Sequence, residues 1–374
     1  MGEKSNICRH IRAERCVFAR SNSAGGCLTF LRGLPGCGEN ARVVLLRSGG
    51  GGAAEALLRT LAKQADALGG APQLLFDGFG REHPCALCIP PLRGSESICF
   101  LDAEAPYALE AKIPGGGEEL FSLDACRQNA QLREKRKELC RAQENRTREL
   151  QRAARFLRAA AAMKRNMAVV AAETLDRPKL KRFAAGLADR KLPAPNGHIG
   201  HESRRFLTAL SGQGILLRGN GLTAEFPNMV VLEDDSGAVA PLLWDILRAY
   251  ALGSGLDVIS CPCLLAPEDA PEHLLIPELG LAFLTANRRH PLAAPGGAAE
   301  GARRILASRF FDRKALQAHG CRLRFCRRAL RELLEEAHEA QTAAENAKAA
   351  LDAIYAPALL PGAIERAAKR LLRG

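Results

Sequence analysis

The sequence repeats itself once, in the same order, over most of its 374 residues. The spacing between matched segments is roughly 186 residues, which indicates two copies of one domain. The matched segments share a Phe-x4-Ser-x2-Gly pattern and several apolar runs; they are residues 18–26 with 206–214, 42–47 with 229–233, 86–90 with 273–277, and 98–103 with 281–286. Chance matches would not keep this order, so the chain is expected to fold as two similar halves.

Each copy alternates segments typical of strands with segments typical of helices. The first copy has an apolar run at residues 42–47, a small-residue loop, a helix that includes Leu57 and Leu58, two more apolar runs and a long helix. Continuous apolar strands separated by helices are typical of parallel sheets covered on both faces. We therefore predict an α/β protein with two tandem domains, each a parallel sheet flanked by helices and carrying a long helical hairpin.

A segment rich in proline and glycine, at residues 191–203, separates the two copies. Such segments favour turns and linkers. The predicted division is a first domain at residues 1–192 that includes a basic helical hairpin, a linker at 193–203, and a second domain at 204–374 with C-terminal helices.

Composition excludes several classes of protein. The chain is 47% apolar and 25% charged, and its first residues lack the apolar core of a signal peptide. It has no uncharged apolar run of about 18 residues, the length that a membrane-spanning helix needs. We expect a cytoplasmic globular protein without a membrane segment, whose 13 cysteines are mostly small core residues rather than a disulfide framework.

A glycine-rich loop follows the first apolar run and precedes a helix. A strand, a glycine loop and a helix in succession are the context of a phosphate-binding loop, because backbone N–H groups and the helix N-terminus can then point at an anion. The candidate binding residues are Ser48, Gly49, Gly50, Gly51, Gly52, Ala53, Ala54 and Glu55.

With these segments in place, the chain resembles an uncharacterised family of duplicated P-loop ATPases, nucleotide-kinase-like proteins of spore-forming bacteria. That family has a Phe-x4-Thr-x2-Gly entry, a GGPGTGKST loop, an IIPEL-type strand and an apolar strand that ends in Asp-x-Thr-Ala-Pro. The counterparts are residues 18–26, 48–55, 89–90 and 101–106 in the first copy, and 206–214, 234–241, 275–279 and 283–291 in the second. The resemblance covers most of the chain and implies a P-loop NTPase fold that binds ATP with Mg²⁺.

Both loops depart from the family pattern at the residues that carry the chemistry. A working loop has a lysine on the β- and γ-phosphates and a Ser or Thr hydroxyl on Mg²⁺. Ala54 and Glu55 take these positions in the first copy, whereas the second loop contains Asp234 and Asp235 and has Ala240 in place of the lysine. A carboxylate about 4 Å from a phosphate costs on the order of 4 kcal/mol at an effective dielectric near 20. We expect a degenerate first loop and an inactive second one.

Asp102, which follows an apolar run, is the candidate for a Walker B carboxylate. Its alternative role is to end a buried strand and cap the next segment. The second copy has Thr285 there, which cannot replace a carboxylate as a metal ligand. Arg47 and Arg59 are nearby cations that could stand in for the missing lysine, although their spacing differs from that of the motif.

Residues 127–165, from Arg127 to Arg165, carry 13 Lys or Arg and 4 Asp or Glu, whereas the whole chain has a net charge of +12. Leucines between Leu132 and Leu157 form one apolar face, which predicts a long amphipathic helix whose remaining surface is cationic. Two interpretations remain open: a solvated face of a helix that packs on its own domain, and a site for nucleic acid or another polyanion.

Three functions follow from these patterns. The first is a degenerate P-loop protein, a pseudo-ATPase that acts as a scaffold or interaction protein with an unknown protein partner. The second is a residual ATPase or nucleotide-kinase-like enzyme that uses ATP and Mg²⁺ at the first loop, with Asp102. The third is a polyanion-binding module that uses the basic helix. The residues of the two loops favour the first function.

Overall fold

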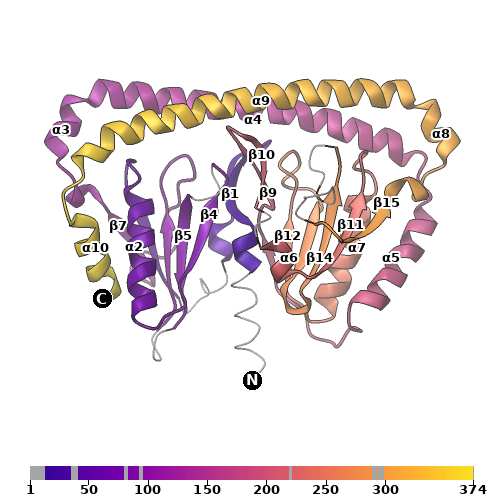
Figure 1. Cartoon of the computed structure of the whole chain (residues 1–374), viewed down its shortest axis with the longest axis horizontal. Helices are drawn as coiled ribbons and strands as arrows, with labels where there is room; N and C mark the ends of the chain where they lie inside the picture. Colours follow the sequence, from indigo (N-terminus) through magenta and orange to yellow (C-terminus); the bar gives the residue numbers. More distant parts are fainter. Residues whose placement is uncertain are drawn as a thin grey trace.

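The computed structural model describes residues 13–34, 41–79, 83–91, 96–218, 221–288, 292 and 299–373. Two β-sheets lie side by side, and a pair of long helices runs across one end of both (Figure 1). A mixed α/β architecture is therefore confirmed. Among the described helices, none combines the length and the apolar composition that crossing a membrane requires.

The first sheet has seven strands in the order β2-β1-β4-β5-β6-β3-β7. They are β1 (Phe18–Ser23), β2 (Gly26–Thr29), β3 (Arg42–Arg47), β4 (Gln73–Asp77), β5 (Pro84–Ile89), β6 (Ile98–Asp102) and β7 (Glu118–Ser122). The strand β3 lies between two parallel neighbours, β6 and β7, and its middle residues are buried. The helix α2 (Ala53–Ala67) follows β3 and covers one face with Leu57, Leu58 and Leu61.

The second sheet has six strands in the order β15-β11-β14-β13-β12-β8. They are β8 (Glu202–Arg204), β11 (Asn228–Glu233), β12 (Val258–Cys261), β13 (His273–Ile276), β14 (Leu281–Ala286) and β15 (Arg303–Leu306), beside a hairpin of β9 (Thr208–Ser211) and β10 (Gly214–Leu217). The short helix α6 (Leu222–Glu225) precedes β11, and the helix α7 (Ala240–Gly253) follows β11. The repeated apolar runs thus occupy corresponding places in the two sheets, whereas residues 289–291 of the matched segments lie outside the described chain.

The prediction of wholly parallel sheets is wrong. The strand β5 is antiparallel to both β4 and β6, and β13 is antiparallel to both β12 and β14. Only residues 78–83 connect β4 to β5, whereas a parallel pair needs a crossover of a dozen or more residues. The apolar runs reflected burial on both faces, and burial alone does not fix the direction of a strand.

The two longest helices pair with each other along most of their length. They are α4 (Arg136–Ala172) and α9 (Gly320–Tyr355), preceded by the short helices α3 (Asn129–Glu134) and α8 (Arg313–Ala318). They run in opposite directions across both sheets (Figure 1). Leu157 and Ala160 of α4 share a hydrophobic cluster with Leu323 and Leu330 of α9. The predicted hairpin within each copy is therefore wrong, because the long apolar face of α4 is covered by a helix of nearly equal length from the other copy.

The helix that follows each long helix packs on the other half of the chain. These helices are α5 (Arg177–Lys191) and α10 (Ala363–Arg373). Leu180 and Leu187 of α5 lie in the core around β11 and α7, whereas Ile364 and Leu371 of α10 lie in the core around β3 and α2. The two halves therefore exchange their last helices, and each half is completed by the other.

This exchange differs from the division expected at residues 192/193. Leu187 precedes the predicted linker at 193–203, yet it is fully buried in the second core. The end of that linker is also ordered, because Glu202–Arg204 forms β8 and pairs with β12. Packing thus joins residues before and after the proline-rich segment into one unit.

The substitution Ile364→Val tests the exchange. It removes one buried methylene from α10 and is expected to lower the free energy of unfolding by about 0.5–1.5 kcal/mol. Ile199→Val makes the same change at a side chain that is 88% exposed, and it should cost less than about 0.5 kcal/mol. Hydrogen exchange should show the weakened amides in α2 and β5, whereas weakening confined to the second sheet would contradict the exchange.

Candidate functional site

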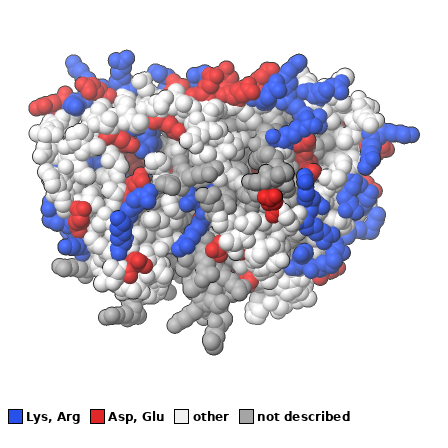
Figure 2. Space-filling model, viewed as in Figure 1, with Lys and Arg blue, Asp and Glu red and all other residues white. Residues whose placement is uncertain are grey.

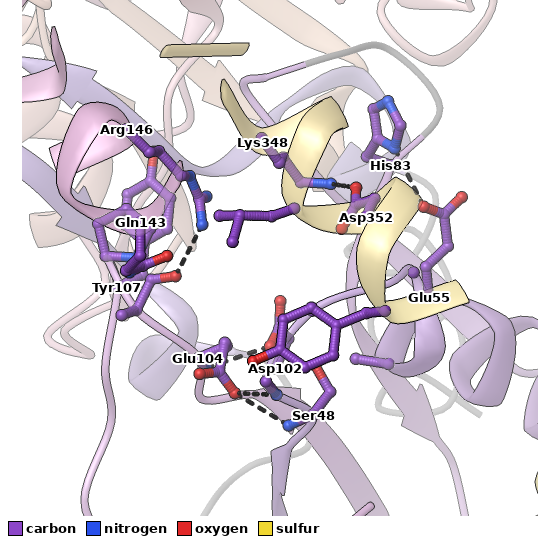
Figure 3. A pocket seen from close by; sticks show the side chains of 18 of the residues that line it. Ser48, Glu55, His83, Asp102, Glu104, Tyr107, Gln143, Arg146, Lys348 and Asp352 are labelled. Atoms are coloured by element: carbon purple, nitrogen blue, oxygen red, sulfur yellow. Dashed lines mark hydrogen bonds and ion pairs between the residues drawn. The ribbon is translucent and has the colours of Figure 1, made fainter. Parts of the chain in front are cut away.

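The glycine loop lies between β3 and α2, as the sequence predicts, and opens into a cavity of about 520 Å³. Loop residues, strand ends of the first sheet and the α4–α9 pair enclose this cavity (Figure 3). Seven of the nine predicted site residues line it: Ser48, Gly49, Gly50, Gly52, Ala54, Glu55 and Asp102. Ala53 is buried in the core of the first half instead.

Backbone N–H groups of the loop donate hydrogen bonds to carboxylates of the same chain. Glu104 Oε2 accepts from the N–H groups of Ser48 at 2.9 Å and Gly49 at 2.8 Å (Figure 3). Asp352 Oδ1, from α9, accepts from the N–H of Gly51 at 2.8 Å. Anionic oxygens form short, strong bonds with backbone N–H groups, whether they belong to a carboxylate or a phosphate. The loop therefore does hold anionic oxygens, and they belong to its own chain.

Tyr355, at the end of α9, covers the loop. A Cβ atom added to Gly50 would lie 2.8 Å from the Tyr355 ring, and one added to Gly51 would lie 2.6 Å from Tyr355 Cβ. Both glycines have positive φ angles, 127° and 71°, which favour glycine. Arg127 lies over the Tyr355 ring at 4.8 Å from its centroid and donates to the carbonyl oxygen of Gly50. The glycines are thus needed for close packing against α9, without any phosphate.

The cations near the loop are held by other groups. Arg59 lies 3.0 Å from a Glu55 oxygen, and Lys348 donates to Asp352 at 2.5 Å. Arg47 donates to the carbonyl oxygen of Leu109 at 3.4 Å. These three side chains are therefore engaged by groups of their own chain.

Glu55 and His83 form a hydrogen-bonded pair at 3.0 Å (Figure 3). The bond to Glu55 raises the pKa of His83 above its ordinary value. Burial alone would raise the pKa of Glu55, but the bonds with His83 and Arg59 outweigh burial and lower it. The His83 contribution to stability is lost as pH rises through its raised pKa, and the Glu55 contribution is lost as pH falls through its lowered pKa. The ion pair therefore contributes most to stability at pH values between the lowered pKa of Glu55 and the raised pKa of His83.

An NMR titration should give His83 a pKa above 6.5 in the wild type and an ordinary value in Glu55→Gln. Because His83 is half exposed, the associated change in stability should stay below about 1 kcal/mol. Glu144→Gln alters another carboxylate of the cavity and serves as the control, with the His83 pKa unchanged. A His83 pKa that stays raised in Glu55→Gln would contradict the pairing.

Asp102 belongs to a buried cluster around Arg20, a residue that the sequence analysis missed. Arg20 donates through Nε to Asp77 at 2.8 Å and through Nη2 to Asp102 at 2.7 Å, and its guanidinium lies 4.8 Å from the Tyr107 ring centroid. Burial alone would lower the pKa of Arg20, but the two carboxylates raise it well above its ordinary value. The sequence carried little signal for this cluster, because Arg20 lies in a mostly polar run, FARSNS, whose complete burial is seen only in the structure.

Both oxygens of Asp102 are engaged in this cluster. Oδ2 accepts from Arg20, and Oδ1 accepts from the N–H of Glu104 at 3.2 Å. These bonds fit the strand-ending role that the sequence left open as the alternative to a Walker B carboxylate. Over the described part of the chain, no group of three or more His, Cys, Asp or Glu side chains is placed to hold a metal ion.

In the second half, a single carboxylate collects the hydrogen bonds of the loop. Asp234 Oδ1 accepts from the Ser236 hydroxyl at 2.7 Å and from the N–H groups of Ser236 and Gly237 at 3.1 and 2.9 Å. Asp234 Oδ2 accepts from the N–H groups of Val239 and Ala240 at 2.8 and 2.9 Å. Asp234 is only 3% exposed. The loop is therefore closed around its own side chain.

The basic segment 127–165 forms α3 and most of α4. The interpretation of a helix that packs on its own domain holds in part, because α4 contacts β1 and β2 but packs mainly along α9. Arg152 pairs with Glu336 of α9 at 3.1 Å. The exposed cations of segment 127–165 are Arg133, Lys135, Arg136, Lys137, Arg141, Arg148, Arg155, Arg158 and Arg165. Polyanion binding by this surface stays a prediction.

The cysteines are mostly buried, as expected. The expectation that they are free thiols fails for one of them. Cys99 is disulfide-bonded, whereas ten other described cysteines are free and seven of these are buried. Burial raises the pKa of Cys16 to about 12 and that of Cys27 to about 11. Thiols with such pKa values are poor nucleophiles at neutral pH.

No protein-family model, curated protein or solved structure matches the chain. The resemblance to duplicated P-loop ATPases therefore rests on the ordered segments of the sequence.

Proposed function

We propose that the chain is a duplicated P-loop protein that has kept the architecture, has lost Mg·ATP chemistry, and acts as a scaffold or interaction protein. One observation carries this proposal: carboxylates of the chain itself accept hydrogen bonds from backbone N–H groups of both loops, residues 48–55 and 234–241. Glu104 and Asp352 do so in the first half, and Asp234 does so in the second.

The arrangement of the strands supports the P-loop part of the proposal. Each loop connects the end of a strand, β3 or β11, to a helix, and each of these strands lies next to one edge of its sheet between two parallel neighbours. Asp102 pairs with Leu46 in the first sheet, and Thr285 pairs with Leu232 in the second. The two positions that the sequence matched therefore have the same place beside the loop strand.

The residues of the first loop do not fit a bound ATP with Mg²⁺. The phosphates would have to displace Glu104 and Asp352, which lie on the N–H groups that they need. Ala54 supplies no cation, and Glu55 stands where the metal-binding hydroxyl belongs. Tyr355 closes the approach to the middle of the loop. We derive no phosphoryl-transfer step for this site.

The long helices support a scaffold. The α4–α9 pair spans both sheets, and the exchanged helices α5 and α10 fasten each end to the opposite half (Figure 1). A bridge of this kind holds two separate surfaces at a fixed distance, which suits binding to partners rather than opening and closing around a substrate.

Thermal unfolding and calorimetry with ATP, ADP and GTP, with and without Mg²⁺, test this proposal. A ligand at a hundred times its Kd should stabilise the fold by about 2.7 kcal/mol. We expect no stabilisation by any of these nucleotides.

A matched variant shows whether any stabilisation comes from the first loop. Gly52→Asp adds a negative charge at the start of α2, and a Cβ at this position meets no atom within 4 Å. Aspartate also tolerates a positive φ better than most residues do. Stabilisation of the wild type by ATP that disappears in Gly52→Asp would contradict the proposal and favour a residual nucleotide-binding enzyme.

A further inference from the structure

A second and larger hollow lies at the other end of α9, far from the first loop. It has a volume of about 1020 Å³ and lies between the N-terminal half of α9, the β9–β10 hairpin and the end of β14. Five arginines line it: Arg288, Arg324, Arg327, Arg328 and Arg331. We call this hollow the arginine groove.

The arginine groove keeps a net positive charge. Asp235 pairs with Arg288 at 3.0 Å, and Glu335 lies 3.7 Å from Arg331. Within the described chain, Arg327 and Arg328 have no ion-pair partner, and the buried Nε of Arg327 has no hydrogen-bond partner. Blue side chains gather over the right-hand part of the helical layer, where α9 begins (Figure 2). A concave surface of this kind attracts anions and raises their local concentration.

An exposed aromatic ring lies among these arginines. Phe325 is 55% exposed, although it is a large apolar side chain on a helix whose other face is buried. Leu210 and Ile215 of the β9–β10 hairpin add apolar surface to the groove. Aromatic rings on which bases stack, set among cations that contact the backbone, are the usual means of binding single-stranded nucleic acid.

We propose that the arginine groove binds single-stranded nucleic acid, with arginines on the phosphates and Phe325 stacked on a base. This site needs no nucleotide at either loop, although Asp235 of the second loop lines it, so it goes beyond the scaffold function. The basic segment 127–165 carries no comparable exposed ring, since its one aromatic residue, Phe156, is partly buried against the α4–α9 cluster. An acidic peptide would use the arginines but would leave Phe325 without a role.

Fluorescence anisotropy with a labelled thymidine oligonucleotide tests the proposal on the full chain. The double variant Arg324→Glu/Arg328→Glu should weaken binding at least about tenfold. Lys137→Glu/Arg141→Glu makes the same change of charge at exposed positions of α4 and should alter the Kd less than about twofold. With about four phosphate contacts, the Kd should rise about fiftyfold between 50 and 200 mM salt.

Substitutions of Phe325 separate base stacking from general attraction of charge. Phe325→Ala should weaken binding about tenfold without a change of charge, and Phe325→Tyr should restore it, because either ring can stack on a base. Equal losses in the two charge variants, or unchanged binding by Phe325→Ala, would overturn the proposal. Equal affinity for a glutamate-rich peptide would also overturn it, and would assign the groove to acidic proteins.

Discussion

The substitution Asp234→Ala is expected to lower the free energy of unfolding by about 3–5 kcal/mol. Five donors of the second loop lose their acceptor in this variant, namely the hydroxyl and N–H of Ser236 and the N–H groups of Gly237, Val239 and Ala240. A buried donor left without a partner costs about 1–3 kcal/mol, and neighbouring effects are not additive. Chemical denaturation of the two proteins measures the difference directly.

The neighbouring residue provides the control for this prediction. Asp235→Ala removes a carboxylate of the same loop whose side chain is 38% exposed and which pairs with Arg288. An exposed pair of this kind contributes less than about 1 kcal/mol. Equal effects of the two substitutions would mean that the Asp234 carboxylate does not hold the loop together.

Arg20→Met is expected to lower the free energy of unfolding by about 3–5 kcal/mol, because it leaves buried charges without a partner. Asp77 and Asp102 both bond to Arg20, and the side chains of Arg20 and Asp77 are only 8% and 6% exposed. Arg304→Met removes an arginine that is 56% exposed and paired with Glu233, and it should cost less than about 1 kcal/mol. Denaturation curves of the two variants give the comparison.

A triple variant separates the loss of charge pairing from the loss of packing. Arg20→Met/Asp77→Asn/Asp102→Asn removes all three charges of the cluster and should recover a large part of the stability lost in Arg20→Met. Buried ion pairs can often be replaced by neutral groups of similar volume at little cost. No recovery in the triple variant would show that Arg20 acts through its packing on Tyr107 instead.

The sequence predicted the local elements of the fold because burial leaves a pattern in neighbouring residues. The apolar runs at β3, β6, β11 and β14 are strands, and both small-residue loops lie between a strand and a helix. The direction of β5 could not be predicted, since residues 84–89 are buried on both faces and would look the same in either direction.

The partners of the first loop could not be predicted, because they depend on tertiary packing. Asp352 and Tyr355 reach the loop from a helix about 300 residues away only because α9 crosses both halves. Glu104 is near in sequence, but its position follows from the turn after β6. The sequence therefore predicted a degenerate loop from the residues that it lacks, and the structure adds the carboxylates that accept hydrogen bonds from the loop N–H groups.

Whether the first loop is filled by its own carboxylates can be measured from the NMR spectrum of the chain labelled with ¹⁵N-glycine, recorded during a titration with ATP and Mg²⁺. We expect the amide signals of Gly49 and Gly51 to stay unchanged at millimolar nucleotide. We also expect Glu104→Gln to move the Gly49 signal and Asp352→Asn to move the Gly51 signal. Saturable movement of both signals in the wild-type protein on addition of ATP would show that the first loop still binds phosphate and that the chain is not a pseudo-ATPase.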